Sequence, residues 1–376
     1  MKILFACGGT GGHINPAIAI ASTLKAKQPD AQILFAGNPK GMEAKLVPQA
    51  GFDFAPITIK GFQRKLTWFN IKYNISSLFY LTTASARSKK LIEGFGPDLV
   101  VGTGGYVSGP ILRKAAQMGI RTASHESNAF PGVTTKLLSR YVDEILLAVP
   151  EAKKYLDPNC KELVVGNPVR ESIVYADREQ ARKKLGVGDK MCIVSFGGSQ
   201  GAHRLNQAMA DLIAWHTKEG GPCTGKIHHI HATGKYGVED FPQMLTERGA
   251  VFQENPNVDI REYINDMDDC LAAADLVICR AGASTVSELT ALGVPAIMVP
   301  SPYVTNNHQE KNARALETHG GVEVLLEQDS SGQALFQTAA GILHDDVRRE
   351  AMASAMAELG IRDAAQRIYE TVQELL

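Results

Sequence analysis

Short apolar runs recur along the chain, and longer stretches with helical spacing separate them. The runs are Ile3–Ala6, Ile33–Ala36, Leu99–Gly102, Thr122–Ser124 and Glu144–Ala148 in the first half, then Cys192–Phe196, Lys226–His231, Leu276–Cys279 and Ala296–Val299. Nearly continuous apolar runs are typical of strands that are buried on both faces of a parallel sheet. Because such strands alternate here with helix-length segments, the sequence predicts βαβ units and an α/β protein.

Two segments about half a chain apart share one pattern. Lys2–His13 reads KILFACGGTGGH, and Met191–Ala202 reads MCIVSFGGSQGA. Each is an apolar strand that runs into a paired-glycine loop, with a helix predicted behind it over Pro16–Leu24 or His203–Ile213. Glycine allows positive φ and lets a ligand approach backbone N–H groups, and a helix N-terminus adds partial positive charge. The repeat predicts two nucleotide-binding folds, each with an anion site.

The length of the chain supports the same division. A chain of 376 residues exceeds the usual size of a single core, so two domains are expected. Gly, Asn and Pro interrupt the periodicity in Val164–Arg170, and we place the hinge there. We expect an N-terminal domain over residues 1–165 and a C-terminal domain over residues 166–354. The end of the helical stretch Val347–Leu376, from about residue 355, is expected to pack back on the N-terminal domain.

Bulk composition excludes some classes of protein. A formal net charge of −1 gives no basic bias, so nucleic acid is not an expected partner. The six cysteines are scattered without a CxxC motif, which predicts a reducing compartment with neither disulfides nor zinc. No apolar run approaches the roughly 20 residues of a membrane span.

One segment, residues 60–90, departs from this average composition. It contains seven basic residues and no Asp or Glu. Its apolar residues with helical spacing are Trp68, Ile71, Ile75, Leu78 and Phe79, and the cations beside them include Arg64, Lys65 and Lys72. Such a stripe fits either a helix packed on its own sheet or an interfacial contact with an anionic membrane. The lack of acidic residues favours the membrane contact.

The glycine loops do not match two well-known nucleotide motifs. The G-x-G-x-x-G fingerprint of nicotinamide and flavin enzymes would require a small residue at Ile14 or at Val107. The strand ILFAG also lacks the terminal acidic residue that would bind a ribose, and no G-K-[ST] follows either loop. An oxidoreductase and a P-loop enzyme are therefore disfavoured.

The second half carries a denser cluster, CRAGASTVSE over Cys279–Glu288. It follows a predicted strand, so Gly282–Ser284 would open the next helix and offer N–H donors to a diphosphate. Glu288 lies one helical turn beyond Ser284, where a carboxylate can accept both hydroxyls of a ribose. A lone glutamate on a helix is usually a solvated charge, but its place behind a glycine turn favours binding.

Six motifs follow one another along nearly the whole chain: GGTGGHINPA near the start, GTGGYVSGP at 102–110, HESN at 125–128, GNPVR at 166–170, GGSQGA at 197–202 and CRAGASTVSE at 279–288. In this order they resemble the MurG family of peptidoglycan GlcNAc transferases. The resemblance implies the GT-B fold, in which two Rossmann-like domains enclose the active site. It implies an inverting transfer of GlcNAc from UDP-GlcNAc to the MurNAc 4-hydroxyl of undecaprenyl-diphosphate-MurNAc-pentapeptide (lipid I), giving lipid II. It also implies a peripheral protein on the cytoplasmic face of the cell membrane, with other cell-wall synthesis proteins as partners.

The resemblance further implies which residues bind the two substrates. Those for UDP-GlcNAc are Thr10, Gly11, Gly12, Asn128, Arg170, Ser199, Gln200, Gly201, Tyr263, Ile264, Ala283, Ser284, Thr285, Val286, Ser287, Glu288 and Gln309. Those for the acceptor diphosphate are Gly9, Gly104, Gly105, Tyr106 and Ser108. Tyr263 stands where the family has phenylalanine, and His308 stands where it often has a second glutamine.

An inverting displacement needs a base beside the acceptor hydroxyl and stabilised charge on the leaving diphosphate. His13, directly after a glycine loop, and Glu126 of HESN are the candidate bases, and the sequence does not choose between them. His13 could instead hydrogen-bond the start of its helix. Asp266 and Asp268 spell the metal motif D-x-D, but they precede a helical segment, so we expect a capping role and no tightly bound metal.

Two other functions remain open at this point. Another GT-B enzyme, such as a glycolipid transferase or a UDP-GlcNAc 2-epimerase, would use the same nucleotide site. An epimerase needs no lipid-binding surface, so the composition of residues 60–90 argues against it. A membrane scaffold with a relict site would need neither intact glycine loops nor the two titratable candidates.

Overall fold

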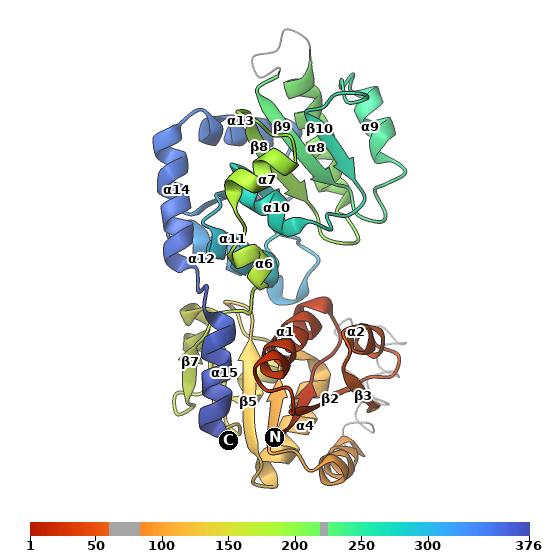
Figure 1. Cartoon of the computed structure of the whole chain (residues 1–376), viewed down its shortest axis with the longest axis vertical. Helices are drawn as coiled ribbons and strands as arrows, with labels where there is room; N and C mark the ends of the chain where they lie inside the picture. Colours follow the sequence, from red (N-terminus) through yellow and green to blue (C-terminus); the bar gives the residue numbers. More distant parts are fainter. Residues whose placement is uncertain (60–82, 219–224) are drawn as a thin grey trace. The chain divides into compact units, whose positions relative to one another are not determined.

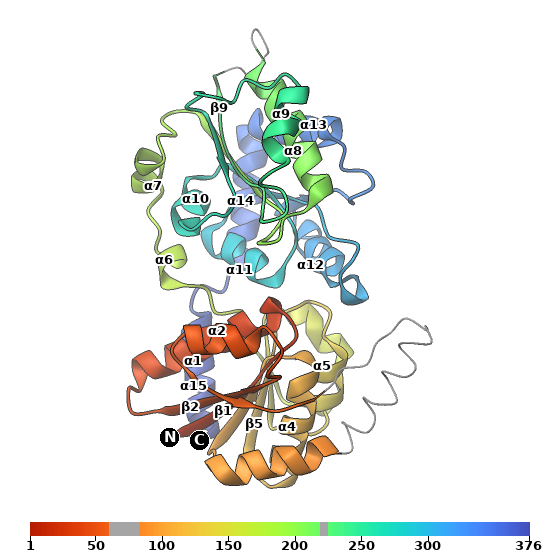
Figure 2. The same ribbon diagram turned by 90° about the vertical axis from the view of Figure 1, so that its right-hand side faces the viewer.

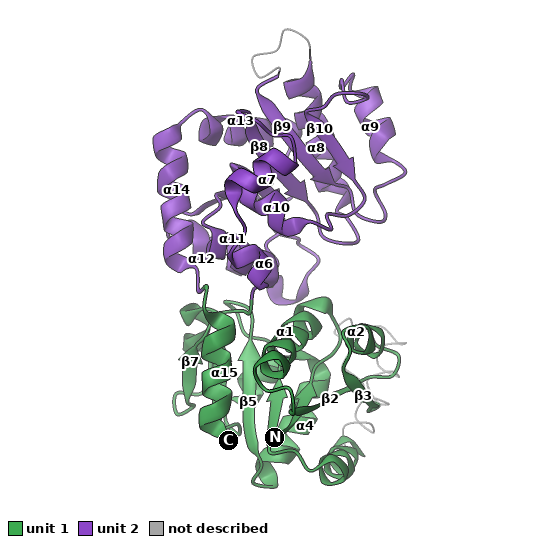
Figure 3. Cartoon of the chain, in the orientation of Figure 1, with its two compact units in different colours: residues 1–168, 362–376 green, residues 169–361 purple. Residues whose placement is uncertain are grey.

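The computed structural model describes residues 1–59, 83–218 and 225–376 (Figure 1). Within them the chain forms two compact units (Figure 3). Unit 1 is Met1–Pro168 together with Arg362–Leu376, and unit 2 is Val169–Ile361. The division after Pro168 falls inside the predicted hinge segment, three residues beyond the expected boundary at 165.

Unit 1 is built on a parallel sheet whose seven described strands lie in the order β3-β2-β1-β4-β5-β6-β7. The strands are β1 (Lys2–Ala6), β2 (Gln32–Gly37), β3 (Asp53–Pro56), β4 (Leu99–Gly102), β5 (Arg121–Glu126), β6 (Glu144–Leu147) and β7 (Glu162–Val164). The helices are α1 (Gly11–Lys27), α2 (Glu43–Gln49), α4 (Gly105–Gln117), α5 (Val133–Leu138) and α15 (Ala364–Leu375), with a 3₁₀ turn over Pro150–Tyr155 and a further helical stretch over 83–95. The topological switch point lies between β1 and β4, which pair directly.

Successive residues of β1 point to opposite faces of the sheet, as the period of a strand requires. Ile3 and Phe5 pack with α1, α2 and α15, whereas Leu4 and Ala6 pack with α4 and the 83–95 helix. Figure 2 shows α1 and α2 on one face of this sheet and α4 and α5 on the other. Both faces are covered, which explains why the strands read as continuous apolar runs.

Unit 2 repeats this topology, with six described strands in the order β10-β9-β8-β11-β12-β13. The strands are β8 (Met191–Phe196), β9 (Ile227–Ala232), β10 (Val258–Arg261), β11 (Leu276–Cys279), β12 (Ala296–Met298) and β13 (Val322–Val324). The helices are α6 (Glu171–Val174), α7 (Arg178–Lys184), α8 (His203–Thr217), α9 (Phe241–Glu247), α10 (Met267–Ala273), α11 (Ala283–Leu292), α12 (His308–Glu317), α13 (Gly332–Leu343) and α14 (Asp346–Leu359), and a 3₁₀ turn spans Thr305–Asn307. The predicted α/β class with two parallel sheets is confirmed.

The C-terminal stretch, predicted as one helical pattern, forms two helices that belong to different units. The backbone at Gly360 packs so closely on Thr290 of α11 that a Cβ there would collide with its carbonyl oxygen. Helix α14 ends at Leu359, directly before this glycine, and packs on α11 in unit 2. Helix α15 packs on α1, and its Ile368 and Val372 complete a core of unit 1.

Four strands have no counterpart among the predicted apolar runs: β3, β7, β10 and β13. Each has three or four residues, and each lies at the edge of its sheet. Edge strands are covered less, so polar residues such as Asp53, Glu162 and Asp259 interrupt their apolar pattern. In the described part of the chain, no helix combines the length and the hydropathy needed to cross a membrane.

Candidate functional site

The two glycine loops of the internal repeat follow the carboxyl ends of β1 and β8, the strands that come first in the chain in each unit. Strand β1 pairs with β4, and β8 pairs with β11, so each loop sits at its own topological switch point. Ligands of open α/β sheets bind at this edge, outside the carboxyl ends of the strands. Each unit therefore places a candidate anion site where the fold provides one.

In unit 1 the glycine loop is shorter than the sequence suggested. Helix α1 begins at Gly11, five residues before the predicted start at Pro16, and Thr10 is its N-cap residue. Gly11 and Gly12 therefore belong to the first helical turn, whose N–H groups have no partner within the helix. Gly9 supplies the turn into the helix with φ +94°, a conformation that favours glycine.

The ring of His13 is held on two sides. Its Nδ1 lies 3.2 Å from the carbonyl oxygen of Gly8 and 3.3 Å from Thr10 Oγ1. Because a carbonyl oxygen only accepts, Nδ1 carries the hydrogen in this contact, and in the neutral ring Nε2 is the basic nitrogen. Gly104 lies under the ring, since a Cβ there would meet its Cδ2 at 2.6 Å. The half-buried ring is thus fixed in a tautomer suited to a base.

The second glycine loop of unit 1 packs directly against the first. Gly104 and Gly105 have φ of +103° and +80°, and a Cβ on Gly105 would collide with the Gly8 carbonyl oxygen. The ring of Tyr106 faces Gly9, and its hydroxyl accepts from Asn38 Nδ2 at 3.2 Å. The predicted acceptor residues Gly9, Gly104, Gly105 and Tyr106 therefore form one cluster.

Ser108, also predicted to bind the acceptor diphosphate, lies beneath that cluster. Its side chain is fully buried, and Oγ lies 2.6 Å from the carbonyl oxygens of both Ala6 and Gly104. With its hydroxyl bonded to this backbone, Ser108 supports the loop from inside the unit. Its contact with the acceptor diphosphate stays a prediction.

Two side chains of the HESN motif, Glu126 and His125, are buried and hydrogen-bonded inside unit 1. Glu126 is buried, and both carboxylate oxygens are occupied: Oε1 accepts from the backbone and side-chain N–H groups of Asn128, and Oε2 accepts from Gly132 N and Thr135 Oγ1. His125 is also buried and donates from Nε2 to Gly166 O at 2.9 Å. Burial lowers the pKa of His125 below its usual range. These two side chains hold the loop that presents Asn128.

A residue that the sequence analysis missed lies beneath the first loop. Glu43, at the start of α2, is completely buried; its Oε1 accepts from Asn38 N at 3.0 Å and its Oε2 from Gly9 N at 3.4 Å. Gly8, Gly37 and Gly41 surround it, and a Cβ on any of them would run into its side chain. No spacing rule connects these positions, because the contact arises only when β1 and β2 pair.

In unit 2 the loop over Gly197–Gly201 is fixed by the loop after β9. Gly198 and Gly201 have positive φ, and the backbone N–H groups of Lys235 and Tyr236 donate to Ser199 O and Gln200 O at 3.1 Å. Gly201 and Gly234 touch so closely that neither has room for a Cβ. The glycines are therefore required both by φ and by this contact.

A cavity of about 620 Å³ lies at this edge of unit 2, within the size range of ligand pockets. Four parts of unit 2 line it: the end of β8 with the β8–α8 loop and the start of α8, the β11–α11 turn with the start of α11, the segment from Ser301 to Gln309, and Glu327 after β13. Of the predicted donor residues, Gly201, Thr285 and Gln309 contribute to its wall. Gln309 is oriented by its Oε1, which accepts from Ser301 N at 2.9 Å.

The cavity is also lined by three charged residues that were not predicted from the sequence. Arg204 lies in the first turn of α8 and is exposed. Arg280 and Glu327 form a buried ion pair, and the guanidinium also donates to Val299 O at 2.9 Å and Pro300 O at 3.1 Å. Arg280 is thereby committed to the protein, whereas Arg204 adds a positive charge beside the helix N-terminus.

Glu288 lies outside the lining of this cavity, on the next turn of α11. Burial raises the pKa of Glu288 to about 6, and the charge of Arg170 opposes that shift. The charge of Arg170 therefore acts on Glu288, and Arg170 does not line the cavity where the diphosphate was expected. Tyr263 is exposed, whereas the side chains of Ile264 and Val286 are buried in the core, so these two offer a ligand only their backbone.

The D-x-D pair has other partners than the sequence suggested. Asp266 is the N-cap residue of α10, but its side chain makes no capping hydrogen bond and pairs instead with Arg261 at 2.5 Å. Asp268 Oδ1 accepts from Asp269 N at 3.1 Å. The capping prediction is wrong because Arg261 competes for the carboxylate. Across the described ranges, no group of three or more His, Cys, Asp or Glu residues could hold a metal ion.

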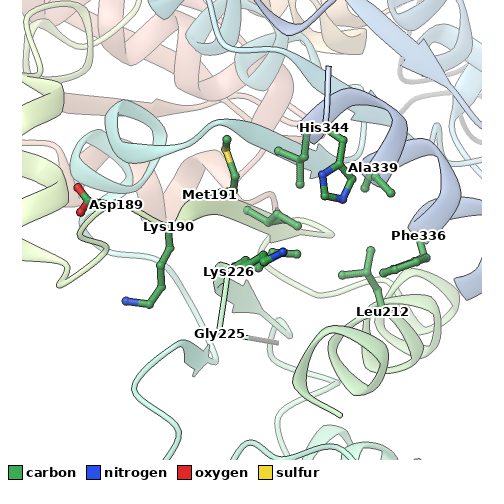
Figure 4. A pocket seen from close by; sticks show the side chains of 13 residues that line it. Asp189, Lys190, Met191, Leu212, Gly225, Lys226, Phe336, Ala339 and His344 are labelled. Atoms are coloured by element: carbon green, nitrogen blue, oxygen red, sulfur yellow. The ribbon is translucent and has the colours of Figure 1, made fainter. Parts of the chain in front are cut away.

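A second cavity of unit 2, of about 530 Å³, lies at the opposite edge of the sheet, where β8 and β9 begin (Figure 4). Its walls include Met191, Ile227, Leu212 and Phe336. It contains none of the predicted site residues and lies at the amino ends of the strands, so it is not the substrate site that this fold predicts.

The predicted membrane stripe lies outside the described residues. This applies to Trp68, Ile71, Ile75, Leu78 and Phe79 and to Arg64, Lys65 and Lys72. The described remainder of the 60–90 segment is helical, and it includes Arg87, Lys89 and Lys90.

Residues 3–147 of the chain match the glycosyltransferase family 28 N-terminal domain, and residues 192–368 match the family 28 C-terminal domain. The crystal structure of Acinetobacter baumannii MurG is similar at a TM-score of 0.78 and 27% identity, covering 99% of each chain. A calicheamicin glycosyltransferase, CalG4, has a TM-score of 0.68 at 16% identity over 100% of this chain and 98% of its own, and shares the fold alone.

The two Rossmann-like units are therefore those of a GT-B glycosyltransferase of family 28. Among its relatives, the UDP-N-acetylglucosamine--N-acetylmuramyl-(pentapeptide) pyrophosphoryl-undecaprenol N-acetylglucosamine transferase of Acetivibrio thermocellus is 45% identical over 100% of this chain and 98% of its own. The protein of that name from Ruminiclostridium cellulolyticum is 41% identical over 100% of both chains. The chain belongs to this family of N-acetylglucosamine transferases, the MurG family.

Proposed function

We propose that the chain transfers GlcNAc from UDP-GlcNAc to the MurNAc 4-hydroxyl of lipid I, giving lipid II for peptidoglycan synthesis. The observation that carries this function is the cavity at the carboxyl edge of unit 2, bounded by a glycine loop and the starts of two helices. A nucleotide sugar with two negative phosphates fits such a site. The full-length similarity to transferases of this specificity supports the same assignment.

In this function unit 2 binds the donor. The N-terminal ends of α8 and α11 receive the diphosphate, and Gln309 contacts the sugar. Glu288 accepts the ribose hydroxyls, and uracil lies at Tyr263 and the backbone of Ile264. As the bond from UDP to the anomeric carbon breaks, charge develops on the diphosphate, and the two helix N-termini with Arg204 stabilise it. These groups supply positive charge without a resident metal, and none is proposed.

Unit 1 binds the acceptor and supplies the base. The N–H groups at the start of α1 and the adjacent loop at Gly104 and Gly105 receive the diphosphate of the lipid carrier. His13 Nε2 takes the proton of the 4-hydroxyl while its oxygen attacks the anomeric carbon and UDP leaves, which inverts that carbon. The proposed contact between Asn128 and GlcNAc stays a prediction.

A lipid-linked acceptor requires the enzyme to work at a membrane. We therefore propose a peripheral position on the cytoplasmic face of the cell membrane, supported by the seven cations and the apolar stripe in residues 60–90.

The test is incubation of the purified chain with labelled UDP-GlcNAc, with and without lipid I in detergent. The expected result is a labelled disaccharide lipid and an equal amount of UDP, formed only when lipid I is present. Conversion of UDP-GlcNAc to its 2-epimer, or to free sugar, without any labelled lipid would contradict the transfer function. A protein that binds UDP-GlcNAc and releases it unchanged in both reactions would be a scaffold with a relict site.

A further inference from the structure

One peptide group joins a buried carboxylate to the ring of His13. Its carbonyl, on Gly8, accepts from His13 Nδ1 at 3.2 Å, and its N–H, on Gly9, donates to Glu43 Oε2 at 3.4 Å. The carboxylate, the peptide group and the imidazole thus form a chain of two hydrogen bonds. The other oxygen of Glu43 is anchored by Asn38 N at 3.0 Å.

The carboxylate occupies a space that the backbone leaves for it. Glu43 is completely buried, and the cage around it consists of Gly8, Gly37 and Gly41, each lacking the Cβ that would fill it. In the part of the chain that the structure describes, Glu43 forms no ion pair. Burying a carboxylate without a cation is costly. An apolar side chain could fill the same cage, but it would leave the N–H groups of Asn38 and Gly9 without this acceptor. Packing alone therefore does not explain a glutamate here.

The linking peptide group is held from its other side as well. Gly105 packs on the Gly8 carbonyl, and Gly104 packs under the ring of His13. Among the residues that the structure describes, the titratable side chains beside His13 that contact this group or its carboxylate include Cys7 and Tyr106. The pKa of the Cys7 thiol is raised, first by burial and then by the charge of Glu43, so the thiol is neutral. The hydroxyl of Tyr106 accepts a hydrogen bond from Asn38 Nδ2 at 3.2 Å. Glu43 is therefore the negative charge nearest to the peptide group among these neighbours.

We propose that Glu43 is a positioning residue for His13, acting through the Gly8–Gly9 peptide group. The proposal rests on the proposed function, in which the proton of the acceptor hydroxyl moves to His13 Nε2. The ring then carries a positive charge until it releases the proton to solvent. Hydrogen bonds in a chain polarise one another, so the carboxylate makes the Gly8 carbonyl a stronger acceptor and stabilises the imidazolium. In a serine-protease triad the carboxylate contacts the histidine directly, whereas here one peptide group lies between them.

The test is an NMR titration of the His13 ring in the full-length protein, assigned by comparison with His13→Ala. Glu43→Gln removes the charge and keeps the shape. Glu93→Gln is the matched control, because Glu93 is an exposed carboxylate of the same unit, paired with Lys89 at 3.6 Å. The expected result is a His13 pKa lower by roughly half a unit to one unit in Glu43→Gln and unchanged in Glu93→Gln. In Glu43→Asp, which keeps the charge but moves it away from Gly9 N, the His13 pKa should lie between the values in the wild type and in Glu43→Gln.

Measurements of turnover distinguish a failure of the Glu43 proposal from a failure of the proposed function. The acidic limb of kcat against pH should shift with the His13 pKa in Glu43→Gln, while KM for UDP-GlcNAc stays unchanged. A folded Glu43→Gln protein whose His13 titrates as in the wild type overturns the proposal. If the His13 pKa shifts but His13→Ala keeps full turnover, the positioning role stands and His13 is not the base.

A wild-type measurement covers the case in which Glu43→Gln does not fold. The amide resonance of Gly9 should then move with the same pH midpoint as the His13 ring, since one peptide group connects them. A Gly9 resonance that does not follow the His13 titration overturns the proposal.

Discussion

The Oε2 atom of Glu126 accepts a hydrogen bond from Thr135 Oγ1 at 2.7 Å, in a side chain that is only 6% exposed. Together with the bonds from Gly132 and Asn128, this contact occupies every strong acceptor direction of the carboxylate. A general base needs a lone pair directed at the proton that it removes. Glu126 therefore shapes the loop after β5, and His13 is the better candidate for the base.

The first prediction compares these two residues. His13→Ala should lower kcat by about 10²-fold or more with little change in KM for UDP-GlcNAc, because the base acts on the acceptor. Glu126→Gln should lower stability by about 1–3 kcal/mol, since an amide donor would then oppose an N–H donor. Its kcat per folded molecule should fall far less than that of His13→Ala. Turnover and urea unfolding of both variants are the measurements. The roles are reversed if Glu126→Gln keeps its stability and loses turnover.

The second prediction concerns the pH dependence of donor binding. The pKa of Glu288 is raised to about 6 by burial, so its carboxylate is ionised above pH 6 and protonated below it. The affinity for UDP-GlcNAc should therefore weaken as pH falls through about 6, because only the ionised form accepts both ribose hydroxyls. The diphosphate of UDP-GlcNAc is esterified at both ends and does not titrate there.

Calorimetry of the wild type and Glu288→Gln from pH 5 to pH 8 measures this effect. At pH 8 the variant should bind more weakly by roughly 1.5–3 kcal/mol, and its affinity should not depend on pH in this way. Equal affinity in the two proteins at pH 8 would remove Glu288 from the donor site.

The third prediction concerns the acid stability of unit 2. Ser195 Oγ lies 2.8 Å from both His229 Nε2 and His231 Nδ1, and His216 Nε2 lies 3.2 Å from His229 Nδ1, all in buried side chains. Burial lowers the pKa of His216 to about 4 and that of His231 to about 3, and it holds the pKa of His229 well below its usual range. These histidines are therefore neutral in the folded protein.

In the unfolded chain these histidines become protonated near their usual pKa of about 6.5. Their contribution to the free energy of unfolding is therefore fully present above that pH and is lost as pH falls. The free energy of unfolding of unit 2 should drop by about 1.4 kcal/mol per pH unit for each histidine between about pH 6 and pH 5. Urea unfolding at several pH values, followed by the fluorescence of Trp215 in unit 2, checks the slope. His216→Phe should remove one histidine's share, and an unchanged slope would contradict the prediction.

The fourth prediction concerns the membrane. Arg64→Gln, Lys65→Gln and Lys72→Gln together should strongly weaken binding to anionic vesicles, since each cation near such a surface contributes about 1 kcal/mol. Added salt should weaken the wild type in the same direction, because the attraction is screened. Turnover on a water-soluble acceptor should survive the triple change. Vesicle binding that responds to neither salt nor substitution would place the membrane contact elsewhere.

The fold could be predicted largely from the sequence because strands buried on both faces leave a clear mark. The central strands β1, β4, β8 and β11 were each predicted to within one residue at either end. The edge strands β3, β7, β10 and β13 were missed, since partly exposed strands of three or four residues carry no continuous apolar run. The sequence also could not show that the C-terminal stretch divides between two units, because the close contact of Gly360 with Thr290 joins residues seventy positions apart.

By itself the sequence determined the α/β class, the repeated glycine loops and the family, since local patterns and motifs carry all three. The tertiary structure alone decided which partners the polar atoms of the candidate side chains have. The side-chain oxygens of Glu126 and Ser108 are hydrogen-bonded to nearby backbone and side-chain groups inside unit 1. The ring of His13 is held through Nδ1, which makes Nε2 the basic nitrogen of the neutral ring. Glu43 gave no signal at all, because a buried carboxylate beneath a glycine loop exists only after two strands pair. Motifs record which groups a site contains, but burial and hydrogen bonding decide which of them remain available for chemistry.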